Sequence, residues 1–554
     1  MCLLLENRFN SFFASHATAT PVSENTSSAI LSPRGARIVP WLVAVAFFMQ
    51  MLDTTILNTA LPGIGRALGV SAIRMHSAII SYMLMTALLI PVSGWLADRW
   101  GARRVFCLGI AFFTFGSALC AASKALEFLI FARAVQGIGG ALMTPVGRLI
   151  ILKAYPRAEF VRLLSFVTLP GLIGPLLGPV GGGFFVEYIS WHWIFLINLP
   201  VGVLGLIFSM IFIPEMANKE AGRFDVAGFL LFSASMVSIS MAMEGFGQLH
   251  LPRAEAGLLA IAGLLFMGIY WLRGASAESK QMLFSPRLFA TRSFSIGITG
   301  NLFARLSAGA VPFLNPLFLQ LGLGLSPLQS GLFMMPTALG ALVAKEIITI
   351  LVAKLGFRRL LTGNTILLAG ILSSFSLITP ETPAILQLLL LACLGTINST
   401  QFMAMNSFTL IELPQADTAS GNSLLAVTQQ ISMSMGVTIA ASLLGGFTVF
   451  YTGVEVGAGS AHGETLLKIF HATFLVVGLL ALVSTCIFSQ ANPELGKRVR
   501  GQRPESPVAA PERIGGRKQG GMIRAILMPV LIFTAIAACS FALYELDILV
   551  LKHH

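Results

Sequence analysis

Apolar runs, each about as long as a membrane-crossing helix, follow one another along almost the whole chain. A bilayer core is about 30 Å thick, and a helix needs roughly 20 apolar residues to cross it. Because lipid offers the backbone no hydrogen-bond partners, we expect α-helices and an all-α integral membrane fold. Divided at charged, proline and glycine residues, the runs predict spans over 38–61, 76–97, 103–122, 126–150, 161–185, 193–214, 225–246, 256–272, 294–319, 327–351, 358–379, 384–410, 419–448 and 465–489.

The two ends of the chain differ from this helical body. Residues 1–37 are rich in Ser, Thr and Ala, which predicts a disordered cytoplasmic tail. Residues 491–521 form a basic linker rich in Pro and Gly, and residues 522–554 contain another apolar run, 525–543. That run is long enough to cross the bilayer once more, so we expect an extra C-terminal transmembrane helix. The sequence assigns it no function.

The distribution of charge supports a membrane protein and predicts its orientation. Only 11% of the 554 residues are charged, against about a quarter in a typical soluble domain. The Lys and Arg residues concentrate in alternate joints, and the positive-inside rule places those joints and the N-terminus in the cytoplasm. They do not gather on one face, so nucleic acid is not an expected partner. The six cysteines are scattered without a CxxC pair, so no metal site or other cofactor is expected.

Ionisable side chains inside apolar runs are costly and therefore candidates for function. In the first span, Gln50, Asp53 and Asn58 share one helix face, and in the fourth, Arg133 and Gln136 begin a stripe of polar and small residues. Both charged groups lie about 11 Å from the outer membrane edge. The proton affinity of a carboxylate beside an arginine changes with water access. We interpret Asp53 as a proton or cation site tuned by Arg133; a structural ion pair is the alternative.

The fifth span is unusually rich in glycine and proline. Most of these residues share one helix face, which suits close packing and bending. We interpret them as a hinge or a specialised interface, with a simple packing groove as the alternative. The residues are Gly171, Gly174, Pro175, Gly178, Pro179 and Gly182.

The short loop between the second and third spans carries one acid and three arginines. Such a loop can cap helix ends and form charge pairs that break when two halves of a protein move. We interpret it as a gate latch, and a loop that only sets topology is the alternative. Its residues are Gly94, Asp98, Arg99, Gly101, Arg103 and Arg104. A weaker copy without the acid, at 353–359, indicates internal duplication.

Over roughly residues 38 to 490 these motifs resemble the major facilitator superfamily, specifically its EmrB- and QacA-like fourteen-span branch of drug:proton antiporters. Segment 52–62 is similar to the first-span motif of that branch, the loop to the superfamily signature, and the fifth span to the antiporter motif. Segment 191–202 is a further mark of the branch, although His192 stands where Arg is usual. Arg305, Asn398 and Asn406 are most similar to MdtD-like members.

The resemblance implies two six-helix bundles, 38–214 and 286–490, with two inserted helices in 215–285. It also implies alternating access, with small amphipathic molecules exported from the bacterial cytoplasm across the inner membrane as protons enter. The expected partners are substrate, protons and the lipid bilayer. We expect a monomer and leave open an accessory periplasmic partner. The candidate cavity residues are Gln50, Asn58, Gln136, Arg305, Asn398 and Asn406.

Two other functions stay open at this stage. The chain could be a dedicated exporter or a symporter of one metabolite, or a non-transporting sensor or partner protein. An enzyme is not expected, because no nucleophile–base pair or metal cluster emerges at useful spacing, and no GxxxxGK[ST] motif is present.

Overall fold

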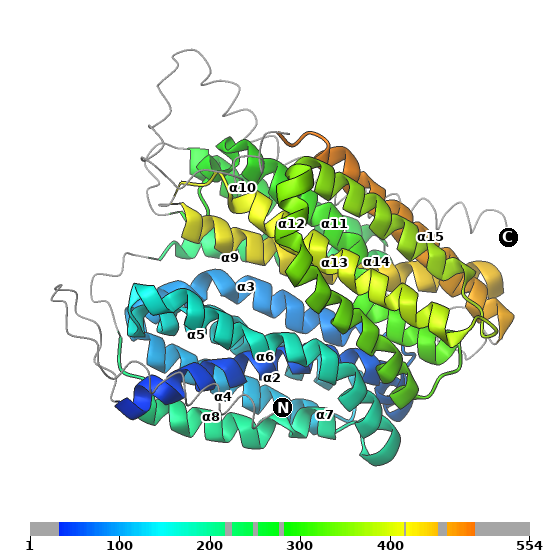
Figure 1. Cartoon of the computed structure of the whole chain (residues 1–554), viewed down its shortest axis with the longest axis horizontal. Helices are drawn as coiled ribbons and strands as arrows, with labels where there is room; N and C mark the ends of the chain where they lie inside the picture. The colour runs from blue at the N-terminus through cyan, green and yellow to red at the C-terminus, as the bar shows by residue number, and fades with distance from the viewer. Residues whose placement is uncertain are drawn as a thin grey trace, which may run out of the picture.

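The fold is built from helices, as the hydrophobic pattern predicts (Figure 1). The computed structural model describes residues 33–216, 224–247, 253–275, 282–414, 417–452 and 463–492. Over these ranges it contains helices and no strands. The all-α prediction is confirmed. Residues 1–32 of the predicted tail, nearly all of the predicted linker and the predicted extra helix at 525–543 lie outside the described residues.

The first group of helices forms one bundle. Its members are α2 (Pro33–Leu68), α3 (His76–Trp100), α4 (Ala102–Ala121), α5 (Leu126–Ala154), α6 (Arg157–Phe184) with the π-helical turn η1 (Phe185–Ile189), α7 (Trp193–Leu196) and α8 (Asn198–Phe212). Helix α2 begins inside the predicted tail, which therefore ends earlier than residue 37. A proline fits a first helical turn because the backbone N–H groups there have no intrahelical partner. Gly101, at φ 94°, makes the one-residue turn between α3 and α4.

The second group of helices forms another bundle. Its members are η2 (Pro286–Ala290), α11 (Arg292–Leu317) with the π-helical turn η3 (Phe318–Gly322), α12 (Pro327–Ser374) with the 3₁₀ turn η4 (Phe375–Leu377), α13 (Ala384–Leu410), α14 (Thr418–Thr452) and α15 (Glu464–Phe488). Helix α12 covers two predicted spans, 327–351 and 358–379. It bends between them at Gly356, whose φ of 71° favours glycine.

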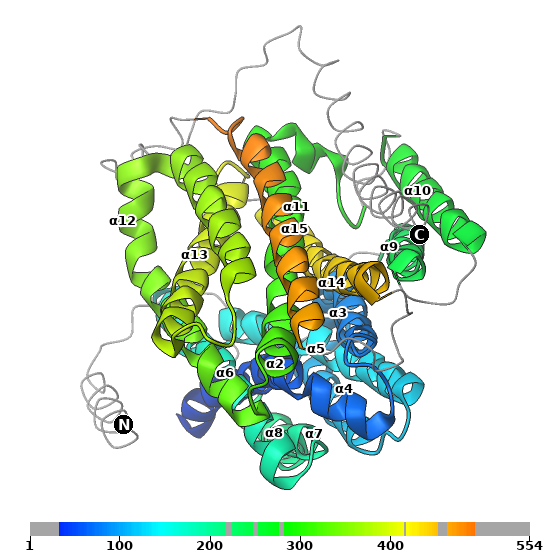
Figure 2. The same ribbon diagram turned by 90° about the vertical axis from the view of Figure 1, so that its right-hand side faces the viewer.

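Two inserted helices, α9 (Val226–Gly247) and α10 (Arg253–Ala275), pack against each other (Figure 2). Helix α9 also contacts α3 of the first bundle and α14 of the second. The Ser77 hydroxyl donates a hydrogen bond of 2.7 Å to the Glu244 carboxylate, which joins α3 to α9. The inserted pair therefore lies beside the junction of the two bundles.

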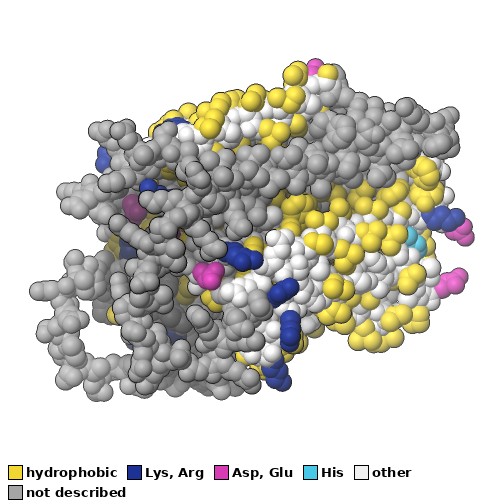
Figure 3. Space-filling model, turned by 90° about the horizontal axis from the view of Figure 1, so that it is seen from above, with side chains coloured by type: hydrophobic (Ala, Val, Ile, Leu, Met, Phe, Trp, Pro, Cys, Tyr) yellow, Lys and Arg dark blue, Asp and Glu magenta, His cyan; other side chains and the backbone are white. Residues whose placement is uncertain are grey.

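The surface fits a lipid environment. Leu272, Leu258 and Ile211 are 69%, 66% and 64% exposed, and Figure 3 shows hydrophobic side chains over wide areas of one face. Twelve helical stretches of the described residues are long and apolar enough to cross a membrane. The long bent helix α12 (Pro327–Ser374) is not counted among these candidate spans. These helices and the apolar surface identify the chain as a multi-pass membrane protein. The count of fourteen spans stays a prediction, with the two arms of α12 in the places of the tenth and eleventh.

Contacts between the bundles define one end of the molecule. We call the ends of the helices after the two ends of α2, the Pro33 end and the Leu68 end. Near the Leu68 end, the Gln320 amide donates a hydrogen bond of 2.8 Å to the Thr59 carbonyl. The Glu187 carboxylate accepts hydrogen bonds from the Ser326 hydroxyl at 2.7 Å and the Leu328 backbone N–H at 2.9 Å. Glu187 thus caps the start of α12 from the opposite bundle.

Candidate functional site

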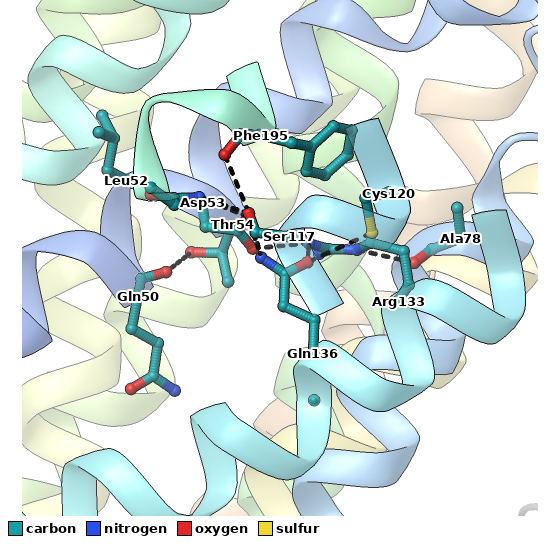
Figure 4. A network of polar contacts seen from close by, with 12 residues as sticks. Gln50, Leu52, Asp53, Thr54, Ala78, Ser117, Cys120, Arg133, Gln136 and Phe195 are labelled. Atoms are coloured by element: carbon teal, nitrogen blue, oxygen red, sulfur yellow. Dashed lines mark hydrogen bonds and ion pairs between the residues drawn. The ribbon is translucent and has the colours of Figure 1, made fainter. Parts of the chain in front are cut away.

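A buried ion pair lies at the centre of the first bundle. Arg133 Nη1 on α5 is 2.6 Å from Asp53 Oδ2 on α2, and each residue is 1% exposed. The sequence places both residues at a similar depth, and the fold brings them into direct contact (Figure 4). A charge buried this deeply requires a partner, because removing either group leaves the other without compensation.

Polar side chains from neighbouring helices surround the carboxylate. The Gln136 amide donates to Asp53 Oδ1 at 2.7 Å, and its Oε1 accepts from Arg133 at 2.7 Å. Ser117 on α4 accepts from Gln136 at 3.3 Å and from Asn198 on α8 at 3.0 Å. Asn198 also reaches Asp53 at 3.5 Å. Helices α2, α4, α5 and α8 therefore meet in one hydrogen-bonded network.

The guanidinium of Arg133 is covered on the α3 side as well. Its central carbon lies 4.4 Å from the centroid of the Tyr82 ring, a cation–π arrangement. Its Nε donates to the Ala78 carbonyl at 3.4 Å. The Asp53 carboxylate and the Arg133 guanidinium are therefore both enclosed by neighbouring helices.

The sequence could not identify every member of this network. Ser117 and Tyr82 were missed, because each is a single uncharged residue in an apolar run and only the fold places it beside the ion pair. Asn198 carried a signal, since it belongs to segment 191–202, which resembles the branch motif.

Three expected cavity residues serve a different purpose in this conformation. Gln50, Asn58 and Gln136 are 6%, 8% and 0% exposed, so they do not line an open cavity here. Gln50 donates to the Gly140 carbonyl at 3.2 Å and accepts from Thr144, which ties α2 to α5. Asn58 donates to the Thr54 carbonyl one turn earlier, at 3.1 Å. Buried amides need such partners, and these are satisfied inside the bundle.

The glycine-rich face of α6 packs closely on α2. A Cβ atom added at Gly174 would lie 2.8 Å from the Cβ of Met51, and one added at Gly178 would lie 2.8 Å from the Cβ of Thr55. Only glycine permits these approaches. Gly182 faces α2 in the same way, and Gly171 meets Met51 at an ordinary distance.

The same helix also contacts the second bundle. A Cβ atom added at Gly183 would lie 2.7 Å from the Cα of Leu328, and one at Gly331 would lie 2.7 Å from the carbonyl carbon of Pro179. Helix α6 therefore packs between α2 and α12. Its use as a hinge stays a prediction.

Three residues of the predicted gate latch form ion pairs, and their use as a latch stays a prediction. Asp98 pairs with Lys153 of α5 at 2.8 Å, and Arg103 and Arg104 reach Glu215 at 2.7 and 3.4 Å. The described pairs of these three residues thus lie within the first bundle rather than across the two bundles. Lys153 lies at the end of α5 and Glu215 follows α8, and both positions are close to this loop.

The remaining cavity candidates belong to the second bundle. Arg305 on α11 is 3% exposed, and its Nε donates to Asn301 Oδ1 at 3.2 Å. Asn406 on α13 accepts a hydrogen bond of 2.7 Å from Gln429 on α14, and Asn398 is half-buried on α13.

Two helical bundles, one of them with a buried polar network at its centre, are typical of a known class of membrane protein. The family model of the Major Facilitator Superfamily matches residues 43–437, and the chain belongs to this superfamily. The chain is 43% identical over 466 residues to "Putative multidrug resistance protein MdtD" of Pectobacterium atrosepticum, covering 84% of this chain and 98% of the relative. It is 46% identical over 407 residues to the protein of that name from Serratia proteamaculans, covering 74% and 85%.

Solved structures share the fold. A POT family transporter in complex with 5-aminolevulinic acid aligns with a TM-score of 0.61 at 17% identity, covering 81% of this chain and 95% of that one. A bacterial homologue of the lysosomal transporter Spinster, in an inward-facing and unoccupied conformation, aligns with a TM-score of 0.56 at 14% identity, covering 84% and 98%. The predicted superfamily fold is confirmed. The chain is a membrane transporter and not an enzyme.

Proposed function

We propose that this chain is a proton-coupled secondary transporter that exports drugs or other small amphipathic molecules across a bacterial inner membrane. Its superfamily membership and the names of its relatives support export of drugs. The buried pair of Asp53 and Arg133 carries the proton-coupling part of the proposal. One charge moved through 100 mV is worth about 2.3 kcal/mol, so proton entry supplies a useful driving force.

The coupling follows from the position of Asp53. Protonation removes the negative charge of Asp53 and leaves the Arg133 guanidinium without a counter-ion in an apolar bundle. Helix α2 carries Asp53, packs on α6, and α6 in turn contacts α12. A shift of α2 after protonation therefore reaches the contact between the two bundles.

The orientation follows from the basic residues. Arg99, Arg103, Arg104 and Lys153 gather where α3 and α5 end and α4 begins, which is the Pro33 end. By the positive-inside rule we assign this end to the cytoplasm. The Leu68 end is then the outer end, and the hydrogen bonds of Glu187 and Gln320 close the bundles there. In this assignment the conformation is closed to the outside, and the pair Asp98–Lys153 is an inner latch.

The test is efflux from energised membrane vesicles with the variant Asp53→Asn. We expect the variant to lose efflux driven by a proton gradient and to keep substrate exchange at equal proton concentrations, because the amide cannot carry the proton. The matched control is Glu464→Gln, the same chemical change on an exposed side chain at the start of α15. Undiminished proton-driven efflux by Asp53→Asn, at normal expression, would exclude Asp53 as the coupling site.

A further inference from the structure

Arg305 is a buried cation whose charge is not matched by a carboxylate. It is 3% exposed, and the ion pairs of the described residues do not include it. Its Nε donates to Asn301, and its Nη1 contacts the Met433 sulfur at 3.9 Å, a weak acceptor. Its Nη2 is buried without a hydrogen-bond partner among the described residues. Arg133, in contrast, has the Asp53 carboxylate as its counter-ion. A buried charge without a counter-ion is costly.

An exposed aromatic ring covers this cation. The central carbon of the Arg305 guanidinium lies 4.1 Å from the centroid of the Phe402 ring, and Phe402 on α13 is 41% exposed. The ring shields one face of the guanidinium and does not cover the N–H groups at the edge of the guanidinium plane. The Phe402 ring thus covers one face of the guanidinium and is itself partly exposed, so rotation of the ring would uncover that face.

Three helices carry amide side chains on the Pro33 side of Arg305. Helices α11 and α14 run in one direction and α13 in the other, so Asn301, Gln429 and Asn406 all lie one turn from the Arg305 level on the same side. Four residues rise about 6 Å along a helix. Asn406 and Gln429 already bond to each other at 2.7 Å. The three amides thus place polar groups about one helical turn from the buried cation, towards the Pro33 end.

We propose that Arg305 binds a carboxylate of the exported molecule, so that the substrates are amphipathic organic anions. The inference rests on the proposed export function and specifies its substrate class. A guanidinium presents its N–H groups in a fork that matches a carboxylate, and an Nη1–sulfur contact is weak enough to be replaced. Phe402 and Met433 are adaptable apolar partners for the body of such a molecule.

The test is a binding comparison between a xanthene dye with a free carboxylate and the methyl ester of the same dye, measured by fluorescence polarisation on the purified full chain. We expect the wild type to bind the acid at least about tenfold more tightly than the ester, as a charged hydrogen bond implies. Arg305→Gln should lose that preference by weakening the acid only, and Arg305→Lys should keep part of it.

The matched control is Arg292→Gln, which removes an exposed arginine at the start of the same helix and should retain the wild-type preference.

A purely structural role of Arg305 is tested by the melting temperature of Arg305→Gln without dye. Loss of an uncompensated charge should leave that temperature unchanged or raise it. If Arg305→Gln does not fold, the wild-type ratio still decides, because equal affinity for acid and ester overturns the proposal. Displacement of the acid by equal concentrations of chloride would also overturn it.

Failure of this site and failure of the export function give different results. Asp53→Asn should bind acid and ester with the wild-type ratio, because Asp53 lies in the other bundle. Normal efflux with equal affinities for acid and ester would remove the anion site and leave export standing. A tenfold preference for the acid without any efflux would support the site and contradict the export function.

Discussion

At the scale of single residues, the buried pair of Asp53 and Arg133 is held by side chains from helices that are distant in the chain. Helical spacing places Asp53 and Gln50 on one face, and the cost of charge in lipid singles out Arg133. Contacts between helices distant in the chain leave no periodic signal. Ser117 and Tyr82 are therefore visible only in the fold, as is the pairing of Asp98 with Lys153.

The ion pair allows a prediction about stability. Arg133→Leu leaves the Asp53 carboxylate buried without its cation and should lower the free energy of unfolding by about 3–5 kcal/mol. Asp53→Asn added to that variant should restore part of the loss, because an asparagine side chain is neutral. Denaturant unfolding in detergent micelles of the two single variants and the double variant measures the coupling. Strictly additive losses would contradict a direct interaction between the two charges.

At the scale of helices, hydrophobic length predicts the spans well and their ends less well. The predicted span 38–61 is longer in the structure, from Pro33 to Leu68, because the helix continues beyond the apolar run at both ends. The predicted separation of 327–351 from 358–379 corresponds to the bend of α12 at Gly356. The sequence indicated that the glycines of the fifth span form an interface, but only the fold identifies α2 and α12 as the partners.

Close packing of α2 on α6 predicts that a larger side chain is not tolerated there. Gly174→Val should push α6 away from Met51 and Leu52, next to Asp53, and lower the free energy of unfolding by about 1–3 kcal/mol. Gly370→Val is the matched control, because open space surrounds a Cβ atom at that position. Melting temperature and vesicle efflux should both fall for the first variant only. Equal effects of the two variants would show that helix propensity, not packing, is responsible.

At the scale of the whole molecule, the superfamily fold can be predicted from the sequence, whereas its conformation cannot. Apolar runs specify crossings, and motifs specify the family, but neither states which ends of the bundles touch. The structure joins them near the Leu68 end through Glu187, Gln320 and the close approach of α6 to α12. Asp53 on α2 is connected to this contact through α6, which would give the proposed proton site a route to the Leu68 end.

Removing the two polar links should open that end. The double variant Glu187→Ala, Gln320→Leu loses the cap on α12 and the bond to the Thr59 carbonyl. The side chain of Thr59 is fully buried, so Thr59→Cys in a chain without its six native cysteines reports opening through labelling by a membrane-impermeant maleimide. Three lost hydrogen bonds, two of them to the Glu187 carboxylate, should speed labelling by about tenfold or more. Glu464→Gln with the same reporter should label at the original rate. An unchanged rate in the double variant would mean that the remaining contacts between the bundles, among them the packing of α6 on α12 and of α3 on α14, hold them closed. Faster labelling makes Glu187 and Gln320 part of the outer gate.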